Sequence, residues 1–150
     1  MNNKGKLYVI GIGPGSLDEM SIRAKKAIEE SEIIVGYTKY IKLIEPLIEG
    51  KEVFSTGMRG ELERVEYALN KSKSKIVSII STGDAGIYGM AGPILEMATD
   101  EEVIVIPGIT ASSSAASLLG APLMHDNCNI SLSDLLTRSE EPRLNSSHLA

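Results

Sequence analysis

The chain has 150 residues, a length that fits one domain with a hydrophobic core. Its net charge of −5 and its scattered basic residues argue against a nucleic-acid or anionic-membrane partner. No apolar run approaches the ~20 residues of a membrane span, and residues 1–6 lack the apolar core of a secretion signal. With one cysteine, Cys128, which cannot form an internal disulfide, these features predict a cytoplasmic protein.

Short apolar runs that favour β-structure recur along the chain. They are continuous rather than alternating, as expected for strands buried on both faces of a parallel sheet. The predicted strands are 7–10, 32–35, 76–80 and 103–106, with a weaker one at 53–54.

Helical spacing of apolar residues occupies the segments between these runs. Predicted helices lie within 20–28, 61–70 and 94–98, and their apolar faces include Leu62 in the second and Leu95 in the third. A helix of small residues over 111–119 should end at Gly120, which favours a left-handed cap. The alternation of strands and helices predicts an α/β fold, with a mainly parallel sheet flanked by helices.

Three loops that follow predicted strands are rich in glycine and small residues: 11–15, 82–89 and 107–111. They are called the first, second and third loop below. The carboxyl edge of an open parallel sheet is where ligands bind, and glycine lets backbone approach a ligand closely. An ordinary tight turn is the alternative for any one of them.

The first loop does not match a nucleotide-binding fingerprint. Ser16 stands where G-x-G-x-x-G requires its third glycine, and the chain has no G-x-x-x-x-G-K-[ST] motif, so a nicotinamide or nucleoside-triphosphate site is disfavoured. Pro14 stiffens the loop and removes an N–H group, which favours packing against a neutral or cationic ligand.

Several stretches in order resemble the tetrapyrrole (corrin/porphyrin) methylase family. They are LYVIGIGPGSLDEMSIRAKKAI, STGDAGIYGMAGPILEM, VIPGITASSSAASLLGAPLMHD and ISLSDLLT, within residues 6–137. GYTKYI, STGMR and GAPLMHDNCNISLSDLLT are most similar to the members that methylate C17 of precorrin-3B or of cobalt-precorrin-3 (cobalt-factor III).

The resemblance implies a methyltransferase of cobalamin biosynthesis that uses S-adenosylmethionine (SAM), bound between two α/β domains. It implies a tetrapyrrole substrate, methylation accompanied by ring contraction, and a homodimer at full length. Any cobalt would arrive with the substrate, because no residue spacing here predicts a protein metal site. The alternatives are a sibling methylase acting at C11 or C20, or a non-catalytic small-molecule-binding domain of the same fold.

Site residues follow from the resemblance position by position. The implied cofactor contacts are Pro14, Thr82, Gly83, Asp84, Ile87, Thr110 and Ala111. The substrate-contact candidates are Gly13, Tyr88, Met90 and Ser133. The catalytic residues are unassigned, with His125, Arg59 and Tyr37 as candidates.

Each catalytic candidate has a competing interpretation. Tyr37 aligns with an Asp that is a proposed proton acceptor in uroporphyrinogen-type relatives, so that role does not transfer to this chain. The position of a Lys that is a proposed donor in relatives falls near Met58 and Arg59, and Arg59 is kept only as a partner for substrate carboxylates. His125 could be a general acid/base, an axial ligand to a substrate cobalt, or a structural histidine held by Asp126.

The resemblance also divides the chain. Residues 1–120 are expected to form the N-terminal methylase domain and 121–137 an interdomain segment with the start of a second domain, the rest of which is expected to be absent. Residues 138–150 have no apolar periodicity. They are a disordered polar tail or a non-native one, and RSEEPRLNSSH is also the translation of a common sequencing adapter with one base lost.

Overall fold

A computed structural model of the chain describes residues 4–131. The chain divides into two compact units, Met1–Ala111 and Ser112–Ala150, which are treated separately below. The predicted domain boundary at residue 120 stays a prediction.

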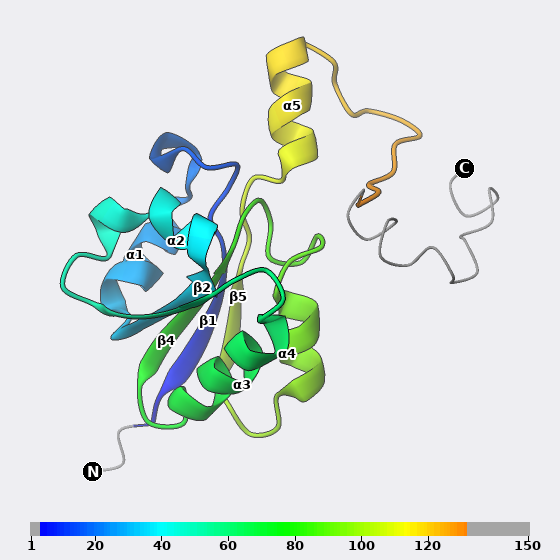
Figure 1. Ribbon diagram of the computed structural model, residues 1–150. Helices are drawn as coiled ribbons and strands as arrows, with labels where there is room; N and C mark the ends of the chain where they lie inside the picture. The colour runs from blue at the N-terminus through cyan, green and yellow to red at the C-terminus, as the bar shows by residue number, and fades with distance from the viewer. Residues whose placement is uncertain (1–3, 132–150) are drawn as a thin grey trace. The chain divides into compact units, whose positions relative to one another are not determined.

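The first unit is built on a parallel sheet of five strands in the order β3-β2-β4-β1-β5 (Figure 1). The strands are β1 (Lys6–Gly11), β2 (Ile33–Tyr37), β3 (Glu52–Thr56), β4 (Ile76–Ser81) and β5 (Val103–Ile106). On the interior strand β1, Val9 is paired with Ile79 of β4 on one side and with Val105 of β5 on the other. The predicted parallel α/β fold is therefore confirmed.

Helices cover both faces of this sheet (Figure 1). They are α1 (Ile22–Glu30), α2 (Thr38–Leu43), α3 (Glu61–Lys71) and α4 (Ala91–Met97), with 3₁₀ helices at Leu17–Glu19 and Glu45–Leu47. Successive residues of β1 alternate between two core clusters: Val9 packs with α3 and α4, and Ile10 packs with α1 and α2. Burial of both faces explains why the strand sequences are continuously apolar.

Local capping sets the helix ends. Ser21 is the N-cap of α1, and its hydroxyl accepts a hydrogen bond from the Ala24 N–H at 3.0 Å. Helix α5 (Ala111–Leu119) begins at the last residue of the first unit, belongs otherwise to the second, and ends where the sequence predicts. Gly120 takes φ +65°, and the N–H of Ala121 donates to the carbonyl of Ala116 at 2.9 Å, the bond pattern of a Schellman cap.

The sequence analysis was wrong about some helical faces and missed α2 and the 3₁₀ helices. Leu62 is 60% exposed and Leu95 is 57% exposed, although both were predicted to face the core. Arg64 takes the buried place on α3 instead, because its guanidinium finds acceptors at the end of β3. Periodicity ranks Arg as a surface residue and cannot anticipate those acceptors.

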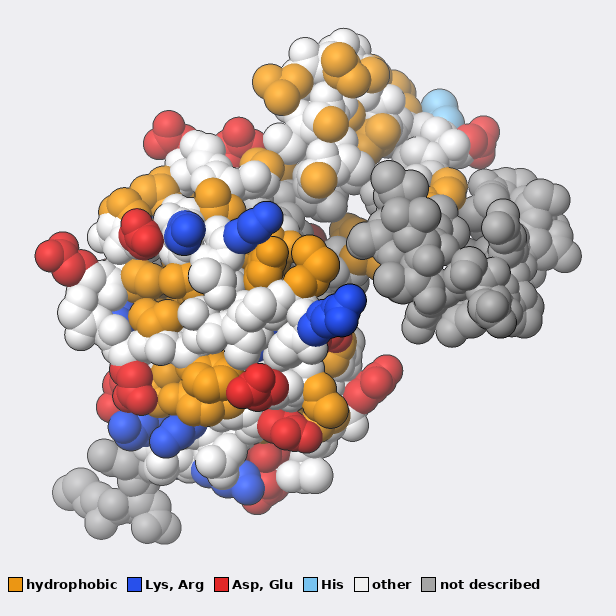
Figure 2. All heavy atoms as spheres, viewed as in Figure 1, with side chains coloured by type: hydrophobic (Ala, Val, Ile, Leu, Met, Phe, Trp, Pro, Cys, Tyr) orange, Lys and Arg blue, Asp and Glu red, His pale blue; other side chains and the backbone are white. Residues whose placement is uncertain are grey.

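Helix α5 exposes its apolar side chains. None of its residues is buried, and Leu118 and Leu119 are 85% and 81% exposed. Figure 2 shows hydrophobic side chains gathered over this helix. Large aliphatic residues are more often buried in folded domains.

Candidate functional site

The three glycine-containing loops begin side by side. Strands β4, β1 and β5 are neighbours in the sheet, and because all are parallel, the loops that follow them leave from one edge. The chain leaves β1 toward α1 on one face and leaves β4 toward α4 on the other. That reversal between adjacent strands marks the crevice where open α/β sheets bind ligands.

Backbone hydrogen bonds join the first loop to the second. Gly13 and Gly83 form an isolated antiparallel bridge, in which the Gly13 N–H donates to Gly83 at 3.1 Å and the Gly83 N–H donates to Gly13 at 2.7 Å. Both residues have positive φ, +79° and +64°, a conformation that glycine adopts at little cost. The bridge therefore needs glycine at both positions.

The third loop packs its backbone onto the other two. A Cβ atom at Gly108 would lie 2.3 Å from the carbonyl oxygen of Gly83 and 2.5 Å from that of Gly11. A Cβ atom at Gly11 would itself lie 2.6 Å from the Gly83 oxygen. The sequence analysis attributed these glycines to close approach of a ligand, which stays a prediction; the structure shows that they also allow close approach of the loops to one another.

A carboxylate adds a second link between the second and third loops. Asp84 is half-buried, and its Oδ1 accepts a hydrogen bond from the Gly108 N–H at 2.9 Å. Its Oδ2 accepts one from the Gly86 N–H, also at 2.9 Å. These contacts and the glycine bridge together define the loop junction, formed by Gly11, Gly13, Gly83, Asp84 and Gly108.

The predicted cofactor residues of the first unit gather around this junction. Pro14 is exposed and directly follows Gly13 of the bridge, and Thr82 directly precedes Gly83. A Cβ atom at Gly83 would lie 3.5 Å from the Cα of Thr110, so the second and third loops touch here too. Within the described residues, no hydrogen bond occupies the half-buried hydroxyls of Thr82 and Thr110. Both hydroxyls are available to a polar ligand.

The substrate-contact candidates are placed differently from one another. Gly13 is buried within the junction, and Ser133 lies outside the described residues. Met90 is buried in the core with α3 and α4, and its N–H donates to the Ser81 hydroxyl at 3.0 Å. Tyr88 is 63% exposed and has φ +53°, an uncommon value for a residue other than glycine.

A hollow of about 350 Å³ adjoins the third loop. It lies in the first unit between the segment 18–21 and the residues Pro107, Gly108 and Ile109. Gly108 is thus part of both the junction and the wall of this hollow, so the geometry of the junction also shapes the hollow.

A second polar group lies at the ends of β2 and β3. Tyr37 is half-buried and packs edge-to-face against Tyr40, with ring centroids 4.9 Å apart. Arg59 is exposed on the loop after β3. Sequence reasoning missed Arg64, which is 6% exposed and whose Nη1 donates to the Thr56 hydroxyl at 2.6 Å and to the Gly57 carbonyl at 2.9 Å.

Burial lowers the pKa of the Arg64 guanidinium from its ordinary value. Its position four residues before Ala68 and next to Val65, on the apolar side of α3, is the sequence signal that could have identified it. Because both acceptors belong to the strand end and the turn after it, Arg64 holds the base of the loop that carries Arg59.

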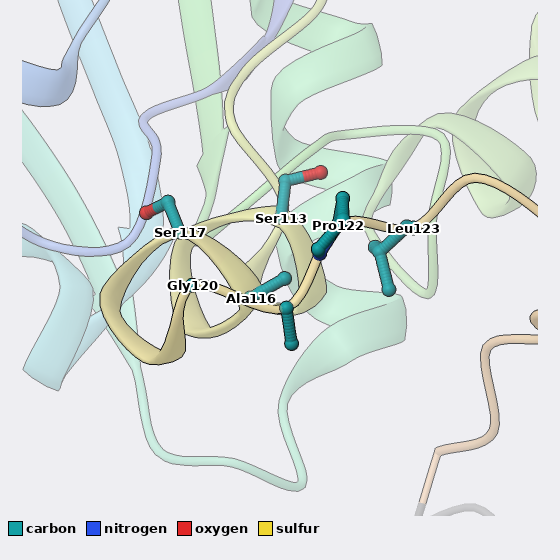
Figure 3. A pocket seen from close by; sticks show the side chains of 7 residues that line it. Ser113, Ala116, Ser117, Gly120, Pro122 and Leu123 are labelled. Carbon is teal, nitrogen blue, oxygen red and sulfur yellow. The ribbon is translucent and has the colours of Figure 1, made fainter.

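The second unit contains a separate hollow of about 440 Å³. Figure 3 shows side chains of α5, including Ala116, facing the segment that follows Gly120, including Pro122 and Leu123. None of the predicted site residues lines it. His125 is exposed in the same unit.

Two searches of the described part of the chain gave negative findings. Residues 4–131 contain no cluster of three or more His, Cys, Asp or Glu side chains that could hold a metal ion. Over the same range, no helix combines the length and apolar character needed to cross a bilayer.

The fold and the junction define a parallel α/β domain in which three glycine-containing loops meet at one edge of the sheet. A profile of the tetrapyrrole (corrin/porphyrin) methylases matches residues 6–149, so the chain belongs to this family. The match covers most of the chain and includes all three loops.

Individual relatives are more specific. The chain is 54% identical, over 87% of its length, to a probable cobalt-factor III C(17)-methyltransferase of Salmonella typhimurium, and 36% identical, over 88%, to a precorrin-3B C(17)-methyltransferase of Sinorhizobium sp.. The crystal structure of the methyltransferase CobJ superposes with a TM-score of 0.82 and 38% identity over 91% of the chain.

The match covers only part of each relative. The chain spans 56% and 55% of the two curated proteins and 59% of the CobJ chain. The structural likeness therefore concerns one portion of a larger fold.

Proposed function

We propose that this chain is the SAM-binding portion of a C17-methyltransferase of cobalamin biosynthesis. Its substrate is cobalt-precorrin-3 (cobalt-factor III) or precorrin-3B, and methylation accompanies contraction of the ring. The observation that carries the proposal is the 54% identity, over 87% of the chain, to a relative named for that reaction.

The loop junction is chemically suited to SAM. The cofactor presents an adenine edge, ribose hydroxyls and an amino-acid end around a sulfonium, and backbone groups with two free hydroxyls can bind these without burying an unpaired charge. Thr82 and Thr110 supply the hydroxyls, and Pro14, Gly83, Ile87 and Ala111 supply backbone and apolar contacts. A further solved structure of this fold, uroporphyrin-III C-methyltransferase of Thermus thermophilus, is a complex with S-adenosylhomocysteine (TM-score 0.61, 23% identity).

The chemistry asks the protein mainly for alignment. SAM carries a methyl group already activated by its sulfonium, so the enzyme must place that methyl in line with the ring carbon. Such positioning is worth roughly 7–11 kcal/mol of the barrier. Loops fixed to one another by backbone contacts meet this need, because they do not reorganise during the reaction.

Substrate contacts belong to the same proposal. Arg59, exposed on the loop after the edge strand β3, pairs with a carboxylate of the tetrapyrrole. Tyr88 packs against the macrocycle from its exposed position on the second loop. The complete enzyme is a cytoplasmic homodimer without a nucleic-acid partner, and any cobalt belongs to the substrate.

A product assay on the full-length enzyme tests the reaction. The protein is incubated with SAM and defined precorrins, and the spectrum and mass of the product are followed. One added methyl at C17 with ring contraction is expected. Methylation at C11 or C20 would identify a sibling enzyme, and no methyl transfer would favour a non-catalytic binding domain.

A further inference from the structure

We propose that Asp84 is a positioning residue, whose carboxylate fixes the third loop to the second and so sets the spacing of Thr82 and Thr110. The identity of the ligand at these loops rests on the proposed function. The linkage itself rests on the contacts within the first unit.

The two oxygens of Asp84 serve two different segments. Oδ2 closes a local turn by accepting the Gly86 N–H, while Oδ1 reaches the Gly108 N–H, 24 residues away in sequence. Hydrogen bonds to a charged acceptor are stronger than those between neutral groups. The long-range bond therefore holds the third loop more firmly than a carbonyl acceptor would.

The third loop needs this bond because its backbone gives it little else. The first and second loops are joined by the Gly13–Gly83 bridge, but no backbone–backbone hydrogen bond joins the third loop to either of them within residues 4–131. In the register of the parallel ladder between β1 and β5, where the Leu7 N–H donates to the Glu102 carbonyl, the next β5 N–H that would face β1 after that of Ile106 is the N–H of Gly108. Gly108 is the first residue after β5 with an N–H to give, and it gives it to Asp84.

The packing around Gly108 makes the linkage matter. Its Cα lies where any side chain would strike the carbonyl oxygens of Gly83 and Gly11. At Gly108 the third loop thus packs against the other two without a side chain. A hydrogen bond of fixed length and direction is then the contact that sets its position.

This assignment differs from a direct cofactor contact. The resemblance implies that Asp84 is a cofactor contact. Both oxygens of its carboxylate, however, accept hydrogen bonds from backbone N–H groups of its own chain. We therefore assign its effect on cofactor affinity to the order of the loops.

Amide hydrogen exchange on the 150-residue chain tests the linkage without any ligand. In Asp84→Ala, exchange at the Gly108 amide should accelerate about tenfold to a hundredfold relative to the wild type, the effect of losing a hydrogen bond to a charged group. Asp84→Asn should fall between the two, because its amide oxygen can still accept one N–H. Asp100→Ala, an exposed Asp before β5, is the matched control and should leave Gly108 unchanged.

A titration with S-adenosylhomocysteine, followed by amide chemical shifts, tests the consequence for the site. Affinity across the wild type, Asp84→Asn and Asp84→Ala should fall in the same order as protection of Gly108. Unchanged exchange at Gly108 in both variants would overturn the proposal. So would an Asn variant that keeps Gly108 protected but binds as weakly as the Ala variant, since that pattern belongs to a direct contact.

The two hypotheses fail in different ways. If the wild type binds no S-adenosylhomocysteine even at millimolar concentration, the proposed cofactor is contradicted for this chain, while the exchange rates still decide whether Asp84 holds the loops. If Asp84→Ala does not fold, Asp84→Asn carries the same comparison.

Discussion

Replacing Gly108 with alanine tests whether the loop junction is closely packed. The added methyl would lie 2.3 Å from the Gly83 oxygen and 2.5 Å from the Gly11 oxygen, whereas 3.4–4 Å is ordinary van der Waals contact. About 1 Å of displacement must therefore be found in backbone that the Gly13–Gly83 bridge already holds. Because Gly108 does not have a positive φ, the cost comes from space rather than from backbone strain.

The expected loss for Gly108→Ala is about 3 kcal/mol of unfolding free energy, the upper end of the usual cost of overpacking. Gly57→Ala is the matched control, because nothing lies within 4 Å of its added Cβ and its φ is not positive. That variant should stay within about 0.5 kcal/mol of the wild type.

Urea denaturation followed by circular dichroism measures both variants, with equal m-values as the condition for comparing them. A Gly108→Ala protein as stable as Gly57→Ala would refute the argument, because it would mean that the loops are not in contact at this point.

Two further predictions rest on other side-chain contacts and a third on the family resemblance. Arg64→Ala should lose about 3 kcal/mol of unfolding free energy, because it removes two hydrogen bonds from a buried charged donor. Arg59→Ala, at an exposed position, should change the unfolding free energy by less than about 0.5 kcal/mol. Equal losses for the two variants in urea denaturation would contradict this. The hydrogen bond from Lys6, and to a lesser extent the one from Tyr8, lowers the pKa of the Glu30 carboxyl below 4.5. The contribution of Glu30 to stability is therefore present above that pH and is lost as the pH falls through the folded-state pKa. Glu30→Gln should therefore flatten the acid side of the stability curve, and an unchanged slope below pH 4.5 would show that the pair adds nothing. Isothermal titration of the 150-residue chain with SAM should show only weak binding, since the resemblance places the other wall of the cleft in a second domain; micromolar affinity would show that this domain is dispensable.

The end of the chain permits a test at the level of the gene. Residues 138–150 lie outside the described residues, so the interpretation of this segment as non-native stays a prediction. The genomic reading frame is expected to diverge from this sequence directly after Thr137. A continuous genomic match through Ala150 would contradict it.

The sequence by itself determined where the strands lie and at which edge the loops gather. Short apolar runs such as 7–10 fit strands that are buried on both faces, and their alternation with helical segments predicts a parallel sheet covered by helices. Once the strands are parallel, every loop that follows a strand leaves from the same edge. The end of α5 at Gly120 could also be predicted from the local sequence, because the cap needs only one residue with positive φ.

Only the tertiary structure decided which loops touch and what holds them. The position of β1 between β4 and β5 depends on long-range pairing, which no local period encodes. The Asp84–Gly108 bond spans 24 residues, and the buried Arg64 depends on acceptors at the end of another element. Propensity and periodicity report the chain a few residues at a time, so contacts that form when distant segments meet lie beyond them.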